Sequence, residues 1–265
     1  MPISLISFEQ NDAFFGYSWK VDDENELARQ IAVIALGYSH HVQKILTNTH
    51  VLMPGTAYDN IPSALELLTV EGADPSHRDG WIFQAISWIA ALKSCPEAVI
   101  AAPHMQHADK GFDGLQLKLD EQNSKVLSAI IFEDKATANP RDTILRKDKG
   151  VWKEFGDLEA GTRSGFFTAK VVALLKSETK LDPDSAIETV IWKEARKYRV
   201  SITVAQNHST ADGRGKLFKG YGDVVSGKTE RRRAETIHVD SLRPWLDRVA
   251  EKAKLAVHSE AKKSV

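Results

Sequence analysis

The stretch SKVLSAIIFEDKA, residues 124–136, reads as a buried β-strand that ends in three consecutive charges. Successive side chains of a strand point to opposite faces, so Glu133 and Lys135 share one face and Asp134 takes the other. A carboxylate and an amine therefore stand side by side at the end of an apolar strand. We take this strand as the centre of the fold and its charged end as the candidate site.

The sequence around this strand predicts the element order helix, three strands, helix, strand. Residues 80–94 are apolar on nearly every side, which is typical of a buried helix, and residues 153–177 predict a helix at least in their second half. Strands are expected at residues 98–104, 111–119, 124–136 and 198–207. The link between the second and third strands is short enough for a hairpin, and the whole pattern predicts an α/β protein.

Further elements are expected on both sides of this unit. They are a strand at residues 14–21, a helix over 23–46, a short helix over 60–70, a strand at 236–239 and a helix over 240–257. The residues around Pro140 are expected to form a basic loop.

The composition narrows the class of protein. The chain has 265 residues, 42% of them hydrophobic and 27% charged, which is the profile of an ordinary soluble globular protein. The formal net charge is -1, so attraction to phosphates has to come from local patches. The single cysteine, Cys95, excludes a disulfide framework and fits a reducing, cytoplasmic setting. The sequence has no signal-peptide pattern and no apolar run near the ~20 residues that cross a bilayer, so no membrane partner is expected.

A second acidic residue is expected to meet the charged strand end. Asp113 precedes Glu133 by 20 positions on the neighbouring expected strand, and a hairpin brings the two side chains to one face. Two carboxylates so close repel each other unless a cation joins them, and Mg²⁺ or Mn²⁺ prefers oxygen ligands. The predicted metal ligands are Asp113, Glu133 and the backbone carbonyl of Asp134. Lys135 is placed to orient or deprotonate a water and to meet charge that develops on a phosphate.

A purely structural alternative stays open for these residues. In that case Glu133 and Lys135 form an ion pair at a strand end, and Asp113 is a turn residue between two glycines. Exposed pairs of this kind are common and contribute only about 0–1 kcal/mol of stability.

Asp113, the triplet Glu133-Asp134-Lys135 and the element order of residues 80–207 together resemble the PD-(D/E)xK nuclease superfamily. The resemblance implies a restriction-endonuclease-like core, an α-β-β-β-α-β unit with helices flanking a mixed sheet. It also implies Mg²⁺- or Mn²⁺-dependent cleavage of phosphodiester bonds, with Asp113 and Glu133 as metal ligands and Lys135 at the nucleophilic water. The implied parts of the chain are an N-terminal α/β extension, the nuclease core and a C-terminal basic segment with a helix, at residues 1–75, 76–210 and 211–265.

Three features depart from the pattern of this superfamily. Phe112 stands where the pattern has Pro, and Asp134 replaces the apolar residue that often separates the acid from the lysine. Many members add a Glu from the first core helix, where this chain has Gln84. Glu66 and Glu71, upstream of that helix, are the alternative acidic ligands.

The resemblance implies a DNA nuclease, with RNA as the less favoured substrate, that acts in prokaryotic restriction, anti-phage defence or repair. Such nucleases often work beside a helicase or another ATPase, and a homodimer is compatible because one site cuts one strand. Two rival functions stay open. One is a non-catalytic nucleic-acid-binding or assembly subunit that keeps the fold. The other is an NTPase that uses Gly222–Thr229, which matches a phosphate-binding loop letter by letter but lacks the expected strand before it and helix after it.

Basic clusters follow the candidate strand and the last core strand. The residues predicted to contact nucleic-acid phosphates are Arg141, Arg146, Lys147, Arg214, Lys216, Arg231 and Arg232. For any one of them, a solvated surface charge is the alternative. His104 and His107 are expected on a surface loop, and His208 either faces the site or lies at the surface.

Overall fold

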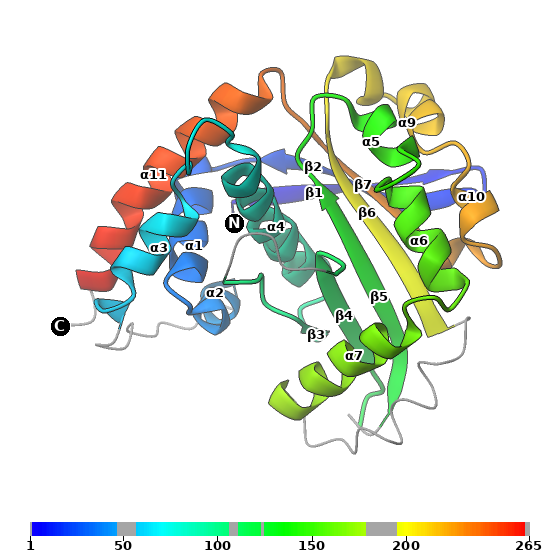
Figure 1. Ribbon diagram of the computed structural model, residues 1–265, viewed down its shortest axis with the longest axis horizontal. Coiled ribbons are helices and arrows are strands. Elements are labelled where there is room, and N and C mark those ends of the chain that lie inside the picture. The colour runs from blue at the N-terminus through cyan, green and yellow to red at the C-terminus, as the bar shows by residue number, and fades with distance from the viewer. Residues whose placement is uncertain (1, 47–56, 106–110, 123–124, 179–194, 263–265) are drawn as a thin grey trace.

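The computed structural model describes residues 2–46, 57–105, 111–122, 125–178 and 195–262. They form an α/β protein whose seven-stranded mixed sheet is strongly curled and flanked by helices (Figure 1). The strands are β1 Ile3–Gln10, β2 Phe14–Val21, β3 Val99–Ile100, β4 Gly114–Leu119, β5 Val126–Lys135, β6 Arg196–Val204 and β7 Arg232–His238. The helices are α1 Glu24–Ala35, α2 Ser39–Leu46, α3 Ile61–Leu67, α4 Ser76–Ser94, α5 Pro140–Leu145, α6 Val151–Glu159, α7 Ser164–Glu178, α9 Ala211–Leu217, α10 Tyr221–Val224 and α11 Leu242–Lys262. Two 3₁₀ turns are η3 Gln206–His208 and η4 Thr229–Arg231.

The strand order in the sheet is β1-β2-β7-β6-β5-β4-β3. The four inner strands β2, β7, β6 and β5 run parallel, while β1 at one edge and β4 and β3 at the other are antiparallel to their neighbours. The carboxyl ends of the parallel strands therefore share one edge of the sheet. The predicted hairpin is confirmed as β4 and β5, with Gly114 opposite Phe132.

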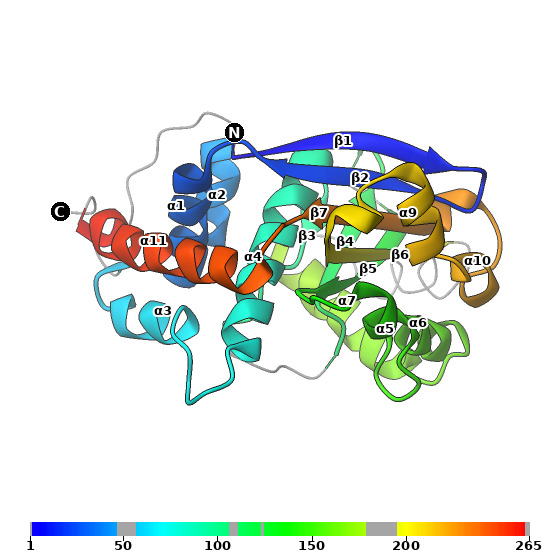
Figure 2. The ribbon, with the colours of Figure 1, turned by 90° about the horizontal axis from the view of Figure 1, so that it is seen from above.

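Strands from both ends of the chain join the same sheet. The expected strand at residues 14–21 is confirmed as β2, and it pairs in parallel with β7 from near the C-terminus. A further strand, β1, precedes it and was not anticipated from the sequence. Figure 2 shows β1 and β2 as one long hairpin, whose turn holds Asn11 and Asp12 at positive φ angles of 40° and 57°. Asn and Asp are the residues that best tolerate this left-handed conformation after Gly.

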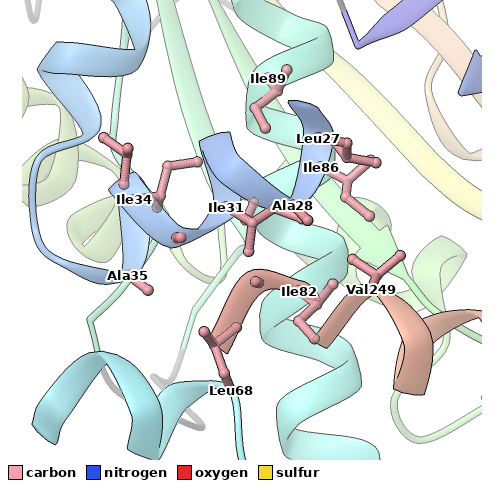
Figure 3. Close-up of a cluster of buried hydrophobic side chains, with 14 of the residues drawn as sticks. Leu27, Ala28, Ile31, Ile34, Ala35, Leu68, Ile82, Ile86, Ile89 and Val249 are labelled. Atoms are coloured by element: carbon pink, nitrogen blue, oxygen red, sulfur yellow. The ribbon is translucent and has the colours of Figure 1, made fainter. Parts of the chain in front are cut away.

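Two hydrophobic cores lie on the two faces of the sheet. One core contains α1, α4 and α11, and Figure 3 shows Ile31 of α1, Ile82 and Ile86 of α4 and Val249 of α11 gathered in it. The other core contains α5, α6 and α7 against β4, β5 and β6. The expected buried helix at residues 80–94 is thus confirmed as the inner part of α4, which packs on β5 from the first core.

Two expectations for local structure are corrected. The single helix expected over 23–46 is broken after α1, where Gly37 has a φ of 86°, so α2 begins a new helix. The loop expected around Pro140 contains α5, because Pro occupies the first helical position, where its missing N–H costs nothing. The helix expected in the second half of 153–177 is confirmed as α7, and α6 precedes it, with Gly161 at a φ of 82° between the two.

Among the residues that the structure describes, no helix is both long enough and apolar enough to cross a bilayer.

Candidate functional site

Asp113, Glu133 and Lys135 meet at the carboxyl end of β5. The Lys135 Nζ atom lies 2.8 Å from Asp113 Oδ2 and 2.7 Å from Glu133 Oε2. These two carboxylate oxygens are therefore at most 5.5 Å apart, the sum of the two distances. The register of the hairpin explains the meeting, because continuing it by one residue places Asp113 opposite Glu133 on one face.

The Asp113 carboxylate is held by three donors. Its Oδ1 atom accepts from the Gln84 side-chain amide at 2.7 Å, which reaches it from α4. Its Oδ2 atom accepts from the main-chain N–H of Asp134 and from Lys135 Nζ, each at 2.8 Å. Every bond comes from a different residue, so the orientation of this carboxylate is fixed by α4 and β5 together.

Burial sets the electrostatics of the site. It raises the pKa of Glu133 to about 8, although Lys135 opposes the shift. Burial also raises the pKa of Asp134 to about 6, against the attraction of the Arg199 guanidinium. For Lys135 burial acts in the lowering direction, but Asp113 and Glu133 outweigh it and the pKa lies above its usual value. The lysine is thus held as a cation between two acidic groups, one of which readily keeps a proton.

The donor set fits a hard divalent cation that keeps several waters. The Asp113 and Glu133 carboxylates lie on two sides of Lys135 Nζ, and Mg²⁺ is typically bound by one or two carboxylates with water in the remaining positions. The N–H and C=O groups of an extended residue point to the same side of a strand. Since the Asp134 N–H points at Asp113, its carbonyl points to that side as well, beyond the start of β4. Within the described ranges, no group of three or more His, Cys, Asp or Glu side chains is arranged for a metal.

Asp134 places its side chain on the opposite face of β5, in the core that contains α4. Its Oδ1 atom accepts from Ser87 Oγ at 2.7 Å. The nearby Arg199 donates to the Ser87 carbonyl and pairs with Glu235 at 2.7 Å. Ser87 and Arg199 are not among the site residues that the sequence predicts. The position of Ser87, three residues after Gln84 and hence on the same side of a helix, is the signal that points to it.

The alternative acidic ligands lie elsewhere. Glu66 belongs to α3, which packs against α1 and α11, and Glu71 is exposed in the turn that follows. Gln84 occupies the place beside Asp113 instead. The site thus combines two carboxylates with one amide.

Several predicted phosphate-binding residues lie on α5 and α9, the helices that follow β5 and β6. Arg141 of α5 donates to the carbonyls of Leu217 and Lys219, which joins the two segments. Arg214 stacks over the Phe8 ring at 4.2 Å and also bonds the Ser209 carbonyl. Three of the predicted residues have exposed side chains and are free to face a polyanion: Arg146, Lys147 and Lys216. Helices α5 and α9 follow the carboxyl ends of β5 and β6, which lie at the same edge of the sheet as Asp113, Glu133 and Lys135.

Arg231 and Arg232 have a different position from the one expected. Both are buried, with 6% of their surface exposed. Arg231 pairs with Glu159 at 2.7 Å and donates to the Arg196 carbonyl. Arg232 donates to the carbonyls of Ala13 and Asp12 and thereby fastens the β1–β2 turn. The structure therefore uses both guanidinium groups inside the protein, where phosphates do not reach them.

The phosphate-loop match has a different local structure. Gly222–Thr229 begins inside the short helix α10 and runs through a loop to η4, after which β7 starts. A phosphate-cradling loop joins a strand to a helix in the opposite order. His208 lies in η3, where its Nδ1 atom is 3.1 Å from the Gly213 carbonyl, and His107 lies outside the described residues.

A cavity of about 490 Å³ opens at the ends of β2 and β7, away from the acidic residues. Trp19, His238, Trp245 and Arg248 contribute to its walls. Its arginine already pairs with a neighbour, Arg248 with Glu24, and His238 Nε2 lies 3.3 Å from Asp240 Oδ1. The candidate site is therefore assigned from the converging carboxylates and not from the cavity.

Comparisons of this chain with protein-family models, curated proteins and solved structures find no match.

Proposed function

We propose that this protein is a metal-dependent nuclease that hydrolyses phosphodiester bonds of DNA. The observation that carries the proposal is the convergence of the Asp113 and Glu133 carboxylates on Lys135 Nζ, which lies 2.8 Å and 2.7 Å from them. Hydrolysis of a phosphodiester needs a cation site and a hydrogen-bond donor to phosphate oxygens or water. The two carboxylates provide the first, and the ammonium group beside them provides the second.

The fold supports the proposal through its element order. Helix α4, the strands β3, β4 and β5, the helices α5 to α7 and then β6 follow one another in the chain. This is the order implied by a restriction-endonuclease-like core, with the acids at the start of the second strand and the end of the third. The N-terminal hairpin and the segment after β6 add to that core.

Each residue of the site has a distinct proposed role. Asp113, Glu133 and the carbonyl of Asp134 hold the cation. When bound, Mg²⁺ or Mn²⁺ supplies a Lewis acid that lowers the pKa of water and neutralises phosphate charge. Lys135 orients the attacking water and donates to the phosphate oxygens, because its ammonium carries three donors and faces both acids. Gln84 fixes the orientation of the Asp113 carboxylate.

The exposed basic residues near the same edge of the sheet are proposed to hold DNA. Arg146 and Lys147 follow α5, and Lys216 lies on α9, which Arg141 joins to α5. Contacts of this kind position the backbone without reading sequence. Because the site resembles that of PD-(D/E)xK nucleases, we propose that the protein acts in the cytoplasm in restriction or anti-phage defence. We also propose that it works with a helicase or another ATPase and that it forms a homodimer.

Cleavage of supercoiled plasmid tests the function directly. With Mg²⁺ or Mn²⁺ the wild type is expected to convert the plasmid to open circles, and excess EDTA is expected to stop the reaction. Glu133→Gln and Lys135→Ala are expected to lose at least about 100-fold in rate, the usual size of a lost acid–base or charge-stabilising group. Glu251→Gln and Lys254→Ala are matched controls, because that pair, 2.8 Å apart, lies on the solvent-facing side of α11.

A non-catalytic DNA-binding subunit is the second candidate function. The observation in its favour is Gln84, an amide where the superfamily often has a third carboxylate. Binding of labelled DNA without cleavage at any divalent metal would select this candidate. Cleavage that persists in both site variants would instead place the chemistry elsewhere in the chain.

A further inference from the structure

Helix α4 contacts the acidic site at two levels. Gln84 donates to Asp113 Oδ1 at 2.7 Å, and one turn later Ser87 donates to Asp134 Oδ1 at 2.7 Å. Residues three apart lie on the same side of a helix, about 4.5 Å along its axis. The two bonds therefore fix both the height and the rotation of α4 relative to the ends of β4 and β5.

Ser87 is itself held from two sides. Its hydroxyl donates to Asp134, and its carbonyl accepts from the buried guanidinium of Arg199 at 3.2 Å. Arg199 is fixed in turn by Glu235 at 2.7 Å and lies 4.4 Å from the centre of the Phe132 ring. Strands β5, β6 and β7 thus each contribute one charged side chain to this buried attachment of α4.

Asp134 connects this attachment to the site through its own backbone. Its carboxylate faces α4, while its main-chain N–H donates to Asp113 Oδ2 at 2.8 Å on the edge of the strand. Asp134 is therefore one of two donors to Asp113 Oδ2, beside Lys135, and Gln84 is the donor to Oδ1. A shift of α4 would withdraw the Gln84 amide from Asp113 even if β5 stayed in place.

We propose that Ser87 and Asp134 are positioning residues, which seat α4 on β5 and so hold the Gln84 amide and the Asp134 N–H on opposite oxygens of Asp113. This inference rests on the proposed function for its consequence, which is the affinity of the site for a divalent cation. It also explains the acidic residue between Glu133 and Lys135, because an apolar side chain there has no acceptor for Ser87. The side chains of Ser87 and Asp134 touch neither substrate nor cation in this scheme, and Asp134 meets the cation through its backbone carbonyl alone.

Titration of Mn²⁺ alone into the full chain, followed by calorimetry, gives the first test. Ser87→Ala removes one hydroxyl and is expected to weaken Mn²⁺ binding about tenfold. Ser94→Ala is the matched control, a hydroxyl two turns later on α4 that bonds Arg233 and not the site. It is expected to bind Mn²⁺ as the wild type does. Equal affinities in Ser87→Ala and the wild type, when both are folded, would overturn the proposal.

A second pair of variants separates the hydrogen bond from the charge of Asp134. Asp134→Asn keeps an oxygen acceptor for Ser87 and is expected to stay within about threefold of wild-type Mn²⁺ affinity, whereas Asp134→Ala is expected to lose about tenfold. Loss of equal size in both would assign Asp134 a purely electrostatic role and overturn the positioning. Such a comparison does not require Ser87→Ala to fold.

A readout without metal keeps this inference distinct from the proposed function. Hydrogen exchange of the Asp134 main-chain amide reports its bond to Asp113, and α4 attachment is expected to protect it. Ser87→Ala is expected to speed this exchange at least about tenfold, while Ser94→Ala leaves it unchanged. If Ser87→Ala speeds this exchange but the wild type neither binds Mn²⁺ nor cuts DNA, the positioning of α4 by Ser87 and Asp134 stands and the proposed nuclease function is rejected. Unchanged exchange in a folded Ser87→Ala variant would reject the attachment.

Discussion

Lys135 Nζ lies 2.7 Å from Glu133 Oε2, so the strand-end lysine pairs with the acid two residues before it on the same face of β5. The same ammonium is 2.8 Å from Asp113. The pair is not an exposed surface contact, because only 3% of the Glu133 side chain is accessible. Glu133 therefore behaves as a buried acid. We expect the stability of the protein to depend on pH, on divalent cations and on substitutions at this site.

Stability of the metal-free protein is expected to fall as the pH rises from about 4.5 to about 8. Burial raises the pKa of Glu133 from 4.5 to about 8, so in this window the folded chain keeps a proton that the unfolded chain has released. The unfolded state then binds fewer protons, and each increase in pH favours it. Thermal unfolding at a series of pH values measures the slope, which Glu133→Gln is expected to flatten. Parallel slopes in the two proteins would contradict the assignment to Glu133.

Asp113→Asn is expected to lower the stability of the metal-free protein by about 1–3 kcal/mol. The carboxylate accepts from three donors, and an amide presents an NH₂ group to at least one of them. Denaturant unfolding without divalent ions provides the measurement. Asp247→Asn on α11 is a control, because its partner Arg78 keeps a second acid, Asp79. No loss in Asp113→Asn would mean that the three donors are not engaged in solution.

Gln84→Glu is expected to make the protein depend more strongly on divalent cations. A third carboxylate would then lie within about 3 Å of Asp113 Oδ1, where like charges repel without a cation and are drawn together by one. The melting temperature is expected to fall in EDTA and to rise more with Mn²⁺ than it does in the wild type. A smaller Mn²⁺-induced rise than in the wild type would show that this position does not face the cation.

The basic residues are expected to divide into a DNA-binding group and a structural group. Lys147→Ala and Lys216→Ala remove exposed charges and are each expected to weaken DNA binding and to reduce the slope of log K against log salt by about 1, with no change in melting temperature. Arg231→Ala leaves the buried Glu159 without its guanidinium partner and is expected to cost about 3–5 kcal/mol of stability. Fluorescence anisotropy at several salt concentrations and thermal unfolding distinguish the groups. If the lysine variants and Arg231→Ala change DNA affinity and melting temperature in the same way, the two groups are not distinct.

The hairpin at the site could be predicted because a local rule governs it. Alternation along β5 fixes which side chains share a face, and a short connection fixes the pairing with β4. Asp113, Glu133 and Lys135 were found in this way. The contacts of Ser87 and Arg199 could not be predicted, because they join α4 to strands far away in sequence. The spacing from Gln84 places Ser87 on the same side of α4, but it does not indicate which residue Ser87 contacts, and nothing in the apolar strand around Arg199 does so either.

The prediction that Arg231 and Arg232 contact phosphates was wrong for a related physical reason. A run such as Arg231, Arg232 and Arg233 is typical of a solvated or polyanion-binding surface. In the structure these side chains find carbonyls and carboxylates inside the protein, Arg233 pairing with Glu235. Burial of an arginine depends on partners supplied by the tertiary fold, which local sequence does not encode.

The position of β7 between β2 and β6 affects the order in which the sheet can form during synthesis. Both site acids leave the ribosome about a hundred residues before the strand that unites the two halves of the sheet, since β7 is Arg232–His238. Until then β6 and β2 each present an open edge to other chains. Pairings so distant in sequence form slowly, so the sheet is expected to close only after β7 has been synthesised, and fragments that stop before β7 are expected to aggregate.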